Sequence, residues 1–191
     1  MVLSVLIATV PGRESLLSRL LWTIQQQRAK DIEVLVYGGW VPFGDKVNAM
    51  RQIATGDFSV VVDDDDLITP HYFDKVLPRL TDDIDYLDYG ILHLEDGKFQ
   101  SVIHSQLPHH KCPIRNDIAK LVELANNYSA DRKYSLAVSG FITKRARLMD
   151  YMYIYEFYTD GTVGTEPSDK NKETQRDVGT YPYDKDVIKW I

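Results

Sequence analysis

The sequence contains little cysteine and no long apolar run. Cys112 is its single cysteine, which excludes a disulfide-stapled scaffold and fits a reducing compartment. The apolar run Val5–Val10 is far too short to span a bilayer, and it lacks the basic flank of a signal peptide. We therefore expect a cytoplasmic protein with no membrane span, and 191 residues are enough for one domain with a substantial core.

Strand and helix patterns alternate over the first sixty residues. Short, β-branched apolar runs at 4–10, 33–37 and 58–62 predict strands that are buried on both faces. Between them, 13–25 and 46–54 carry apolar side chains at helical spacing. Strand–helix–strand–helix–strand in this order predicts parallel strands with helices packed on the sheet, which is a Rossmann-like α/β fold.

Patterns in the second half are weaker. We expect a helix over 71–80, a hairpin turn at 95–97 and a short helix over 115–124. From residue 159 the composition becomes polar and is punctuated by glycine and proline. We therefore predict one domain over 1–158, followed by 159–191, a mobile segment or lid whose apolar end docks back on the domain.

Four consecutive aspartates, Asp63–Asp66, directly follow the third predicted strand. In open α/β sheets, ligands bind at the carboxyl ends of the strands. Carboxylates crowded there repel one another unless a cation neutralises them. Hard oxygen ligands suit Mg²⁺ or Mn²⁺, which would bridge the phosphates of a nucleotide. A solvated acidic loop is the alternative, but the position between a buried strand and a helix start favours a metal site.

Four motifs occur in a fixed order along the first half. They are Ser4-Val-Leu-Ile-Ala-Thr-Val-Pro-Gly-Arg13, Gly44-x-Lys46-x-Asn48, Ala54-x-Gly56-Asp57-Phe58 and Asp63-x-Asp65-Asp66. Their order and spacing resemble the nucleotide-binding half of family-2 glycosyltransferases with the GT-A fold, clearly over 2–80 and more loosely over 81–150. The resemblance implies a mixed, mostly parallel central sheet flanked by helices, with the nucleotide sugar bound by 1–80 and the acceptor by 81–158.

The resemblance also implies roles for individual residues in binding a nucleotide diphosphate sugar. Asp63 matches the first aspartate of the family's DxD motif, which holds the ribose or the metal. Asp65 matches the aspartate that ligates Mn²⁺ or Mg²⁺, and Asp64 and Asp66 are expected to support it. The residues expected near the nucleoside, ribose and phosphates are Thr9, Pro11, Arg13, Lys46 and Asn48.

Tyr37 marks a departure from the family pattern. It ends the second predicted strand, where the family often carries an acidic residue that contacts uracil. Tyr37 is expected to stack on the base instead. A UDP-sugar is favoured as donor, and this departure leaves another nucleotide open.

An inverting transferase needs a general base to deprotonate the acceptor hydroxyl. The resemblance places this base at Asp131, with Ala130 where the family commonly has glutamate; a plain carboxylate at a helix start is the alternative. The QxxRW signature of processive synthases does not follow Asp131, so we expect transfer of a single sugar. His110 is expected to ligate the metal or contact the acceptor, while Asp66, Lys111, Arg115 and Arg132 are expected on the acceptor and phosphate side.

Two readings of other classes compete with a glycosyltransferase. A phosphatase of the haloacid dehalogenase type also carries Asp-x-Asp after a strand, which Asp63 and Asp65 would fit. However, Leu67 replaces the usual Thr or Val, and the motif follows the third strand instead of the first. A GT-A-like module that binds a nucleotide or glycan without turnover is the second reading, supported by Ala130 alone.

The net charge of −6 is unevenly distributed. Residues 57–96 carry a net charge of −10, whereas 97–150 hold nine bases against four acids. The acceptor is therefore open between a glycan or lipid-linked saccharide and a hydroxymethylated pyrimidine in viral DNA. Side chains that could follow a nucleic-acid backbone, or simply be solvated, are Lys111, Arg115, Arg132, Lys133, Lys144, Arg145, Arg147, Tyr151, Tyr153 and Tyr155.

Overall fold

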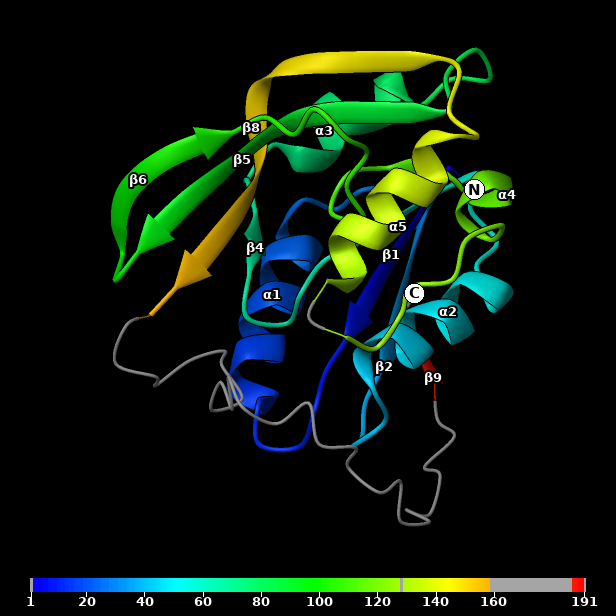
Figure 1. Cartoon of the computed structure of the whole chain (residues 1–191). Helices are drawn as coiled ribbons and strands as arrows, with labels where there is room; N and C mark the ends of the chain where they lie inside the picture. The colour runs from blue at the N-terminus through cyan, green and yellow to red at the C-terminus, as the bar shows by residue number, and fades with distance from the viewer. Residues whose placement is uncertain (1, 128, 159–186, 191) are drawn as a thin grey trace.

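A mixed, nine-stranded sheet forms the centre of the computed structural model, which describes residues 2–127, 129–158 and 187–190 (Figure 1). The strands are β1 (Leu3–Ala8), β2 (Ile32–Tyr37), β3 (Phe58–Val61), β4 (Leu67–Ile68), β5 (Tyr86–Glu95), β6 (Lys98–Ile103), β7 (Ile114–Arg115), β8 (Arg145–Phe157) and β9 (Val187–Trp190). Their order is β4-β8-β5-β7-β3-β1-β2-β9, and β6 pairs with β5. The helices are α1 (Glu14–Gln26), α2 (Phe43–Ile53), α3 (Tyr72–Val76), the 3-10 turn η1 (Leu77–Arg79), α4 (Asn116–Ala119) and α5 (Ala130–Ser139).

The predicted α/β start is confirmed. Strands β2, β1 and β3 are parallel neighbours, with Leu3 of β1 level with Ile32 and Phe58. Every residue of β1 is buried, as expected for a strand covered on both faces. Figure 1 shows α1 on one side of β1 and α2 with α5 on the other. This places the carboxyl ends of β1, β2 and β3 together at one edge of the sheet.

The motif Ala54-x-Gly56-Asp57-Phe58 joins the start of β3 to β1 and β2. The buried carboxylate of Glu33 accepts hydrogen bonds from Ser4 Oγ at 2.5 Å and from the Gly56 N–H at 3.1 Å. A Cβ at Gly56 would lie only 2.6 Å from Ser4 Oγ and 2.7 Å from Ser4 N, so a larger residue would force the strands apart. The motif therefore has a structural role at the amino end of β3, where it holds β1, β2 and β3 together.

Two elements of the second half differ from the sequence prediction. The helix expected over 115–124 is reduced to the single turn α4. Strand β8, thirteen residues long, was not predicted; it runs parallel to β5 and antiparallel to β4. Its outer half alternates Tyr151, Tyr153 and Tyr155, an aromatic pattern typical of strands. The expected hairpin is present as β5 and β6.

The end of the chain returns to the sheet. The backbone of β9 pairs antiparallel with β2, with Val34 opposite Trp190. The sequence predicts that the apolar end of the chain docks back on the domain, and β9 does so. The part of the chain expected to be mobile, 159–185, lies outside the described residues. Within the described parts of the chain, no helix is long and apolar enough to cross a membrane.

Candidate active site

The acidic cluster, Asp63–Asp66, lies where β1 and β3 end. Because β1 and β3 are parallel, Thr9 at the end of β1 comes beside Asp64, whose Oδ2 accepts a hydrogen bond from Thr9 Oγ1 at 2.6 Å. Arg13, in the loop before α1, donates to Asp64 Oδ1 at 2.6 Å and to Asp65 Oδ2 at 3.1 Å. The structure thus brings Thr9, Arg13 and the aspartates together, as the sequence predicts. The Arg13 guanidinium is engaged by carboxylates in this arrangement.

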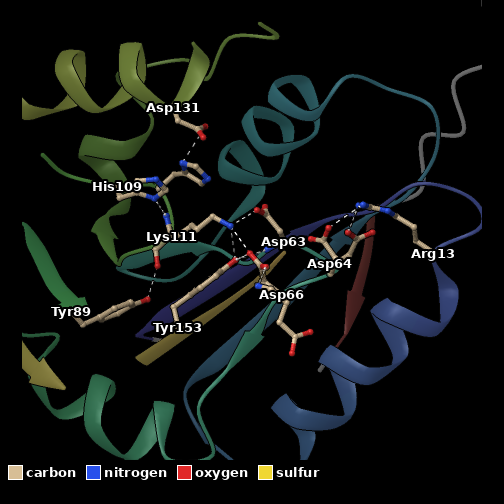
Figure 2. A network of polar contacts seen from close by, with 12 residues as sticks. Arg13, Asp63, Asp64, Asp66, Tyr89, His109, Lys111, Asp131 and Tyr153 are labelled. Atoms are coloured by element: carbon tan, nitrogen blue, oxygen red, sulfur yellow. Dashed lines mark hydrogen bonds and ion pairs between the residues drawn. The ribbon is translucent and has the colours of Figure 1, made fainter. Parts of the chain in front are cut away.

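Lys111 inserts its amino group into the acidic cluster, a position that sequence reasoning missed. Strand β7 runs antiparallel to β3, with Ile114 opposite Ser59, so the residues before β7 run alongside the end of β3. Lys111 Nζ is ion-paired with Asp63 and with Asp66, the latter at 2.5 Å (Figure 2). Burial alone would lower the pKa of Lys111, but Asp63 and Asp66 raise it above its usual value. The lysine is therefore a fixed internal cation.

Buried tyrosines hold Lys111 and its partners in place. Tyr153 of β8 accepts a hydrogen bond from the Asp63 N–H at 3.1 Å and donates to Asp66 Oδ2 at 2.6 Å. Tyr89 of β5 donates to the Lys111 carbonyl at 2.6 Å (Figure 2), and its hydroxyl lies 3.0 Å from that of Tyr72. The site is thus braced by β5 and β8, and no motif in the sequence marks these tyrosines as its supports.

The acidic cluster fits a divalent cation. Asp63, Asp65 and Asp66 each offer an oxygen, all within 4.8 Å of one another. Lys111 pairs with Asp63 and Asp66, and Arg13 pairs with Asp64 and Asp65. The charge of buried Lys46 also acts on Asp64, so these four carboxylates face three cations. Asp63 Oδ1 is buried and has no hydrogen-bond partner among the described residues. Clustered hard oxygen donors of this kind suit Mg²⁺ or Mn²⁺.

Burial shifts the protonation of the cluster. Burial raises the pKa of Asp66 to about 6, although the positive charge of Lys111 opposes this rise. Burial also raises the pKa of Asp64 and of Asp65, with Arg13 opposing it in both. A bound cation would favour the ionised carboxylates and oppose these shifts.

Asp131 lies in the first turn of α5, beside the pair of histidines that precedes Lys111. Its side chain is 57% exposed, and its Oδ1 lies 3.5 Å from Nδ1 of the buried His110. Burial of the carboxylate raises the pKa of Asp131, Asp63 adds to the rise, and Lys111 opposes it. His109, His110 and Asp131 form a cluster separate from the aspartates. His110 is therefore not placed as a ligand beside Asp63 and Asp65.

Several predicted site residues have other roles. Arg115 lies opposite Phe58, the first residue of β3, and pairs with Asp117 at 2.7 Å, so the structure places it at the amino end of β3 and not with the aspartates that follow the other end. Asn48 uses its amide on the Leu124 backbone, donating at 3.0 Å and accepting at 2.9 Å. Asn48 therefore holds the backbone at Leu124, and its expected place near the ribose stays a prediction.

Other predicted residues line or support the carboxyl edge. Buried Lys46 donates to the Thr9 carbonyl at 2.5 Å and so supports the loop after β1. Pro11 is exposed in that loop, and Arg132 is exposed in the first turn of α5. Their expected contacts with substrate stay predictions.

Tyr37 is poorly placed to stack on a base. Its side chain belongs to the core and is only 8% exposed. Trp40, three residues further along and still at the carboxyl edge, is 61% exposed. Trp40 is therefore a better candidate than Tyr37 for stacking on a base.

Solved structures of S. aureus TarS resemble this chain. The complex of TarS 1–349 with UDP matches with a TM-score of 0.71 and 16% identity, over 82% of this chain and 60% of that one. The complex with UDP-GlcNAc matches with a TM-score of 0.70 and 16% identity, over 82% and 58%. A longer TarS structure matches with a TM-score of 0.69 and 16% identity, over 82% of this chain and 37% of that one.

The described chain thus corresponds to less than two thirds of each TarS chain. No protein-family model matches the sequence, and no curated protein matches it either. TarS is a family-2 glycosyltransferase, and the structural neighbours have the GT-A fold. The comparisons therefore confirm the predicted GT-A fold and, at the level of the fold, the resemblance to family-2 glycosyltransferases.

Proposed function

We propose that this chain transfers one sugar from a nucleotide diphosphate sugar to an acceptor hydroxyl, with inversion at the anomeric carbon. The observation that carries the proposal is the acidic cluster at the carboxyl ends of β1 and β3 in a GT-A sheet, with three carboxylate oxygens within 4.8 Å of one another and Asp131 nearby. The likeness to TarS, solved with UDP and with UDP-GlcNAc, supports a UDP-sugar as donor. Asp63 and Asp65 would hold Mn²⁺ or Mg²⁺, which neutralises charge on the diphosphate when bound.

Asp131 acts as the general base in this proposal. The acceptor oxygen bonds to the anomeric carbon while the bond from that carbon to the diphosphate oxygen breaks. The hydroxyl proton passes to Asp131, and the nucleoside diphosphate leaves with the bonding electron pair. The half-exposed Asp131 is open to an acceptor, and Lys111 fixes Asp63 and Asp66 as donor-side carboxylates.

A saccharide hydroxyl is the proposed acceptor. The alternative of a DNA acceptor came from the size and charge distribution of the chain, with basic and aromatic side chains that could follow the backbone of DNA. Lys111 and Tyr153 are instead buried among the aspartates, and Arg115 lies at the amino end of β3. The GT-A fold also gives no support to the phosphatase reading.

A nucleotide-sugar panel tests the proposed function. The chain is incubated with UDP-, GDP- and TDP-sugars, with Mn²⁺ or with EDTA, against simple glycans and against hydroxymethylated DNA. We expect release of UDP that depends on Mn²⁺ and on a glycan acceptor. Transfer to DNA alone would contradict the proposed acceptor. Nucleotide binding without any turnover would favour the non-catalytic module.

The proposed metal site predicts that Asp65→Asn binds Mn²⁺ more weakly than the unaltered chain. We expect Mn²⁺ binding in the presence of UDP, measured by titration calorimetry, to weaken by at least about tenfold because a charged ligand is lost. Asp74→Asn, an exposed acid in the first turn of α3, is the control and should leave Mn²⁺ binding unchanged. Equal binding in both variants would remove Asp65 from the metal site.

The fluorescence of Trp40 is expected to report the binding of UDP. We expect UDP to quench tryptophan fluorescence, and Trp40→Ala to lose this quenching and bind UDP about tenfold more weakly, because stacking on a base contributes about 1–3 kcal/mol. Trp22, 63% exposed on α1, supplies the control Trp22→Ala. Quenching that survives in Trp40→Ala would show that the base binds elsewhere.

A further inference from the structure

His110 carries a buried nitrogen that lies close to the carboxylate of the proposed base. Its side chain is 2% exposed, and Nδ1 lies 3.5 Å from Asp131 Oδ1. Nδ1 has no hydrogen-bond partner among the described residues. A buried polar atom left unpaired costs stability, so a buried nitrogen without a partner 3.5 Å from a carboxylate calls for an explanation.

The position of the His110 ring is fixed on several sides. The His110 carbonyl accepts a hydrogen bond from the Val61 N–H at 2.9 Å, which ties the residue to the end of β3. The ring stacks on His109 with centroids 4.4 Å apart and meets Phe43 of α2 edge-on at 6.2 Å. Asp131, by contrast, is half-exposed. Of the two partners, the histidine is the rigid one.

We propose that His110 is a positioning residue for Asp131, donating an N–H from Nδ1 to one carboxylate oxygen and leaving the other free for the acceptor hydroxyl. This inference rests on the proposed function, in which Asp131 is the base. At 3.5 Å the contact is longer than a hydrogen bond, and a small rotation of the half-exposed Asp131 side chain would close it. Catalytic hydrogen bonds are commonly long without substrate and shorten in the complex.

The charges around the pair favour a neutral histidine. Burial, then His109, Lys111 and Arg51 of α2, lower the pKa of His110 well below its ordinary value. A neutral imidazole carries one N–H, and the carboxylate facing Nδ1 favours the tautomer with the proton there. Asp131 also faces Asp63 and Lys111, which act on its pKa in opposite directions.

A metal ion held by His109, His110 and Asp131 is the alternative for this cluster. The three residues offer ligand atoms within 4.8 Å of one another. The lone pair of an imidazole nitrogen lies in the plane of its ring, so two ligating rings must have planes that both contain the metal. The His109 and His110 rings are stacked, with only 29° between their planes. This arrangement favours a hydrogen bond over shared coordination.

The test compares His110→Leu, which removes the donor, with His110→Asn, whose amide can donate from near the position of Nδ1. In His110→Leu we expect kcat to fall about ten- to a hundredfold, as for a misplaced catalytic group, with KM for the UDP-sugar unchanged. The acidic limb of the pH profile should move to higher pH, because Asp131 loses a donor that stabilises its charged form. His110→Asn should restore most of kcat and the position of the limb.

A double-mutant cycle decides whether His110 acts through Asp131. In an Asp131→Asn background, His110→Leu should cause no further loss of kcat, since the group it positions is already gone. A further loss, or equal defects in His110→Leu and His110→Asn with the limb unmoved, would assign His110 to packing. Bound zinc that purifies with the protein and is lost in His110→Leu would favour the metal site and overturn the proposal.

A measurement without turnover separates this inference from the proposed function. Carbon-13 NMR titration of the Asp131 carboxyl should give a higher pKa in His110→Leu than in the unaltered chain. An unchanged pKa would overturn the positioning role. If the chain turned over no nucleotide sugar while this shift was observed, the proposed reaction would fail and the His110–Asp131 contact would stand.

Discussion

Replacement of Asp131 by asparagine is expected to lower kcat by about two to four orders of magnitude, because an amide cannot take the proton of the acceptor hydroxyl. The substitution keeps the size of the side chain, and Asp131 is half-exposed, so folding and UDP binding should persist. UDP release under saturating donor and acceptor measures kcat, and titration calorimetry measures the binding of UDP. The burial that raises the pKa of Asp131 also predicts that activity is lost, as the pH falls, at a higher pH than for an ordinary aspartate.

The control for Asp131→Asn is Asp74→Asn, which also removes an exposed acid from the first turn of a helix. If Asp131 served only to complement the α5 dipole, both variants would lose about 0.3–1 kcal/mol of stability and keep their activity. Full activity in Asp131→Asn would therefore reject the proposed base.

Lys111→Met should lower the free energy of unfolding by about 3–5 kcal/mol, because it leaves a buried carboxylate without its partner. Lys111 is ion-paired with Asp63 and Asp66 and also donates a hydrogen bond to the Tyr153 hydroxyl at 2.9 Å. Methionine can fill the space of the lysine stem, so the loss measures the missing charge more than a cavity. Urea denaturation followed by circular dichroism gives the difference.

Lys75→Met is the matched control. Lys75 forms an exposed pair with Asp150 at 2.8 Å, and an exposed pair contributes only about 0–1 kcal/mol. The double variant Lys111→Met with Asp66→Asn should recover part of the loss, because it removes the charge left unpaired. Similar losses in Lys111→Met and Lys75→Met would show that the cluster is solvated and that Lys111 is not its internal cation.

Local pattern was sufficient for the first half of the fold. The apolar runs of β1, β2 and β3 and the amphipathic spacing of α1 and α2 depend on short stretches of chain, and the parallel arrangement follows from their alternation. Asp63–Asp66 could be located because they directly follow a buried strand. Thr9 and Arg13 were assigned to the same site by the family resemblance, and the structure brings them to the aspartates because the parallel strands β1 and β3 end together.

The remaining features of the site depend on contacts between distant segments. Lys111 reaches Asp63 because β7 pairs antiparallel with β3, and the same pairing places Arg115 at the amino end of β3. Tyr153 reaches Asp66 because β8 lies between β4 and β5. The local sequence around a basic residue does not indicate which distant strand will lie beside it in the fold. The order of the motifs was therefore enough to predict a GT-A fold with an acidic site. Strand pairing decided which basic side chains lie among the aspartates and where the histidines lie beside them.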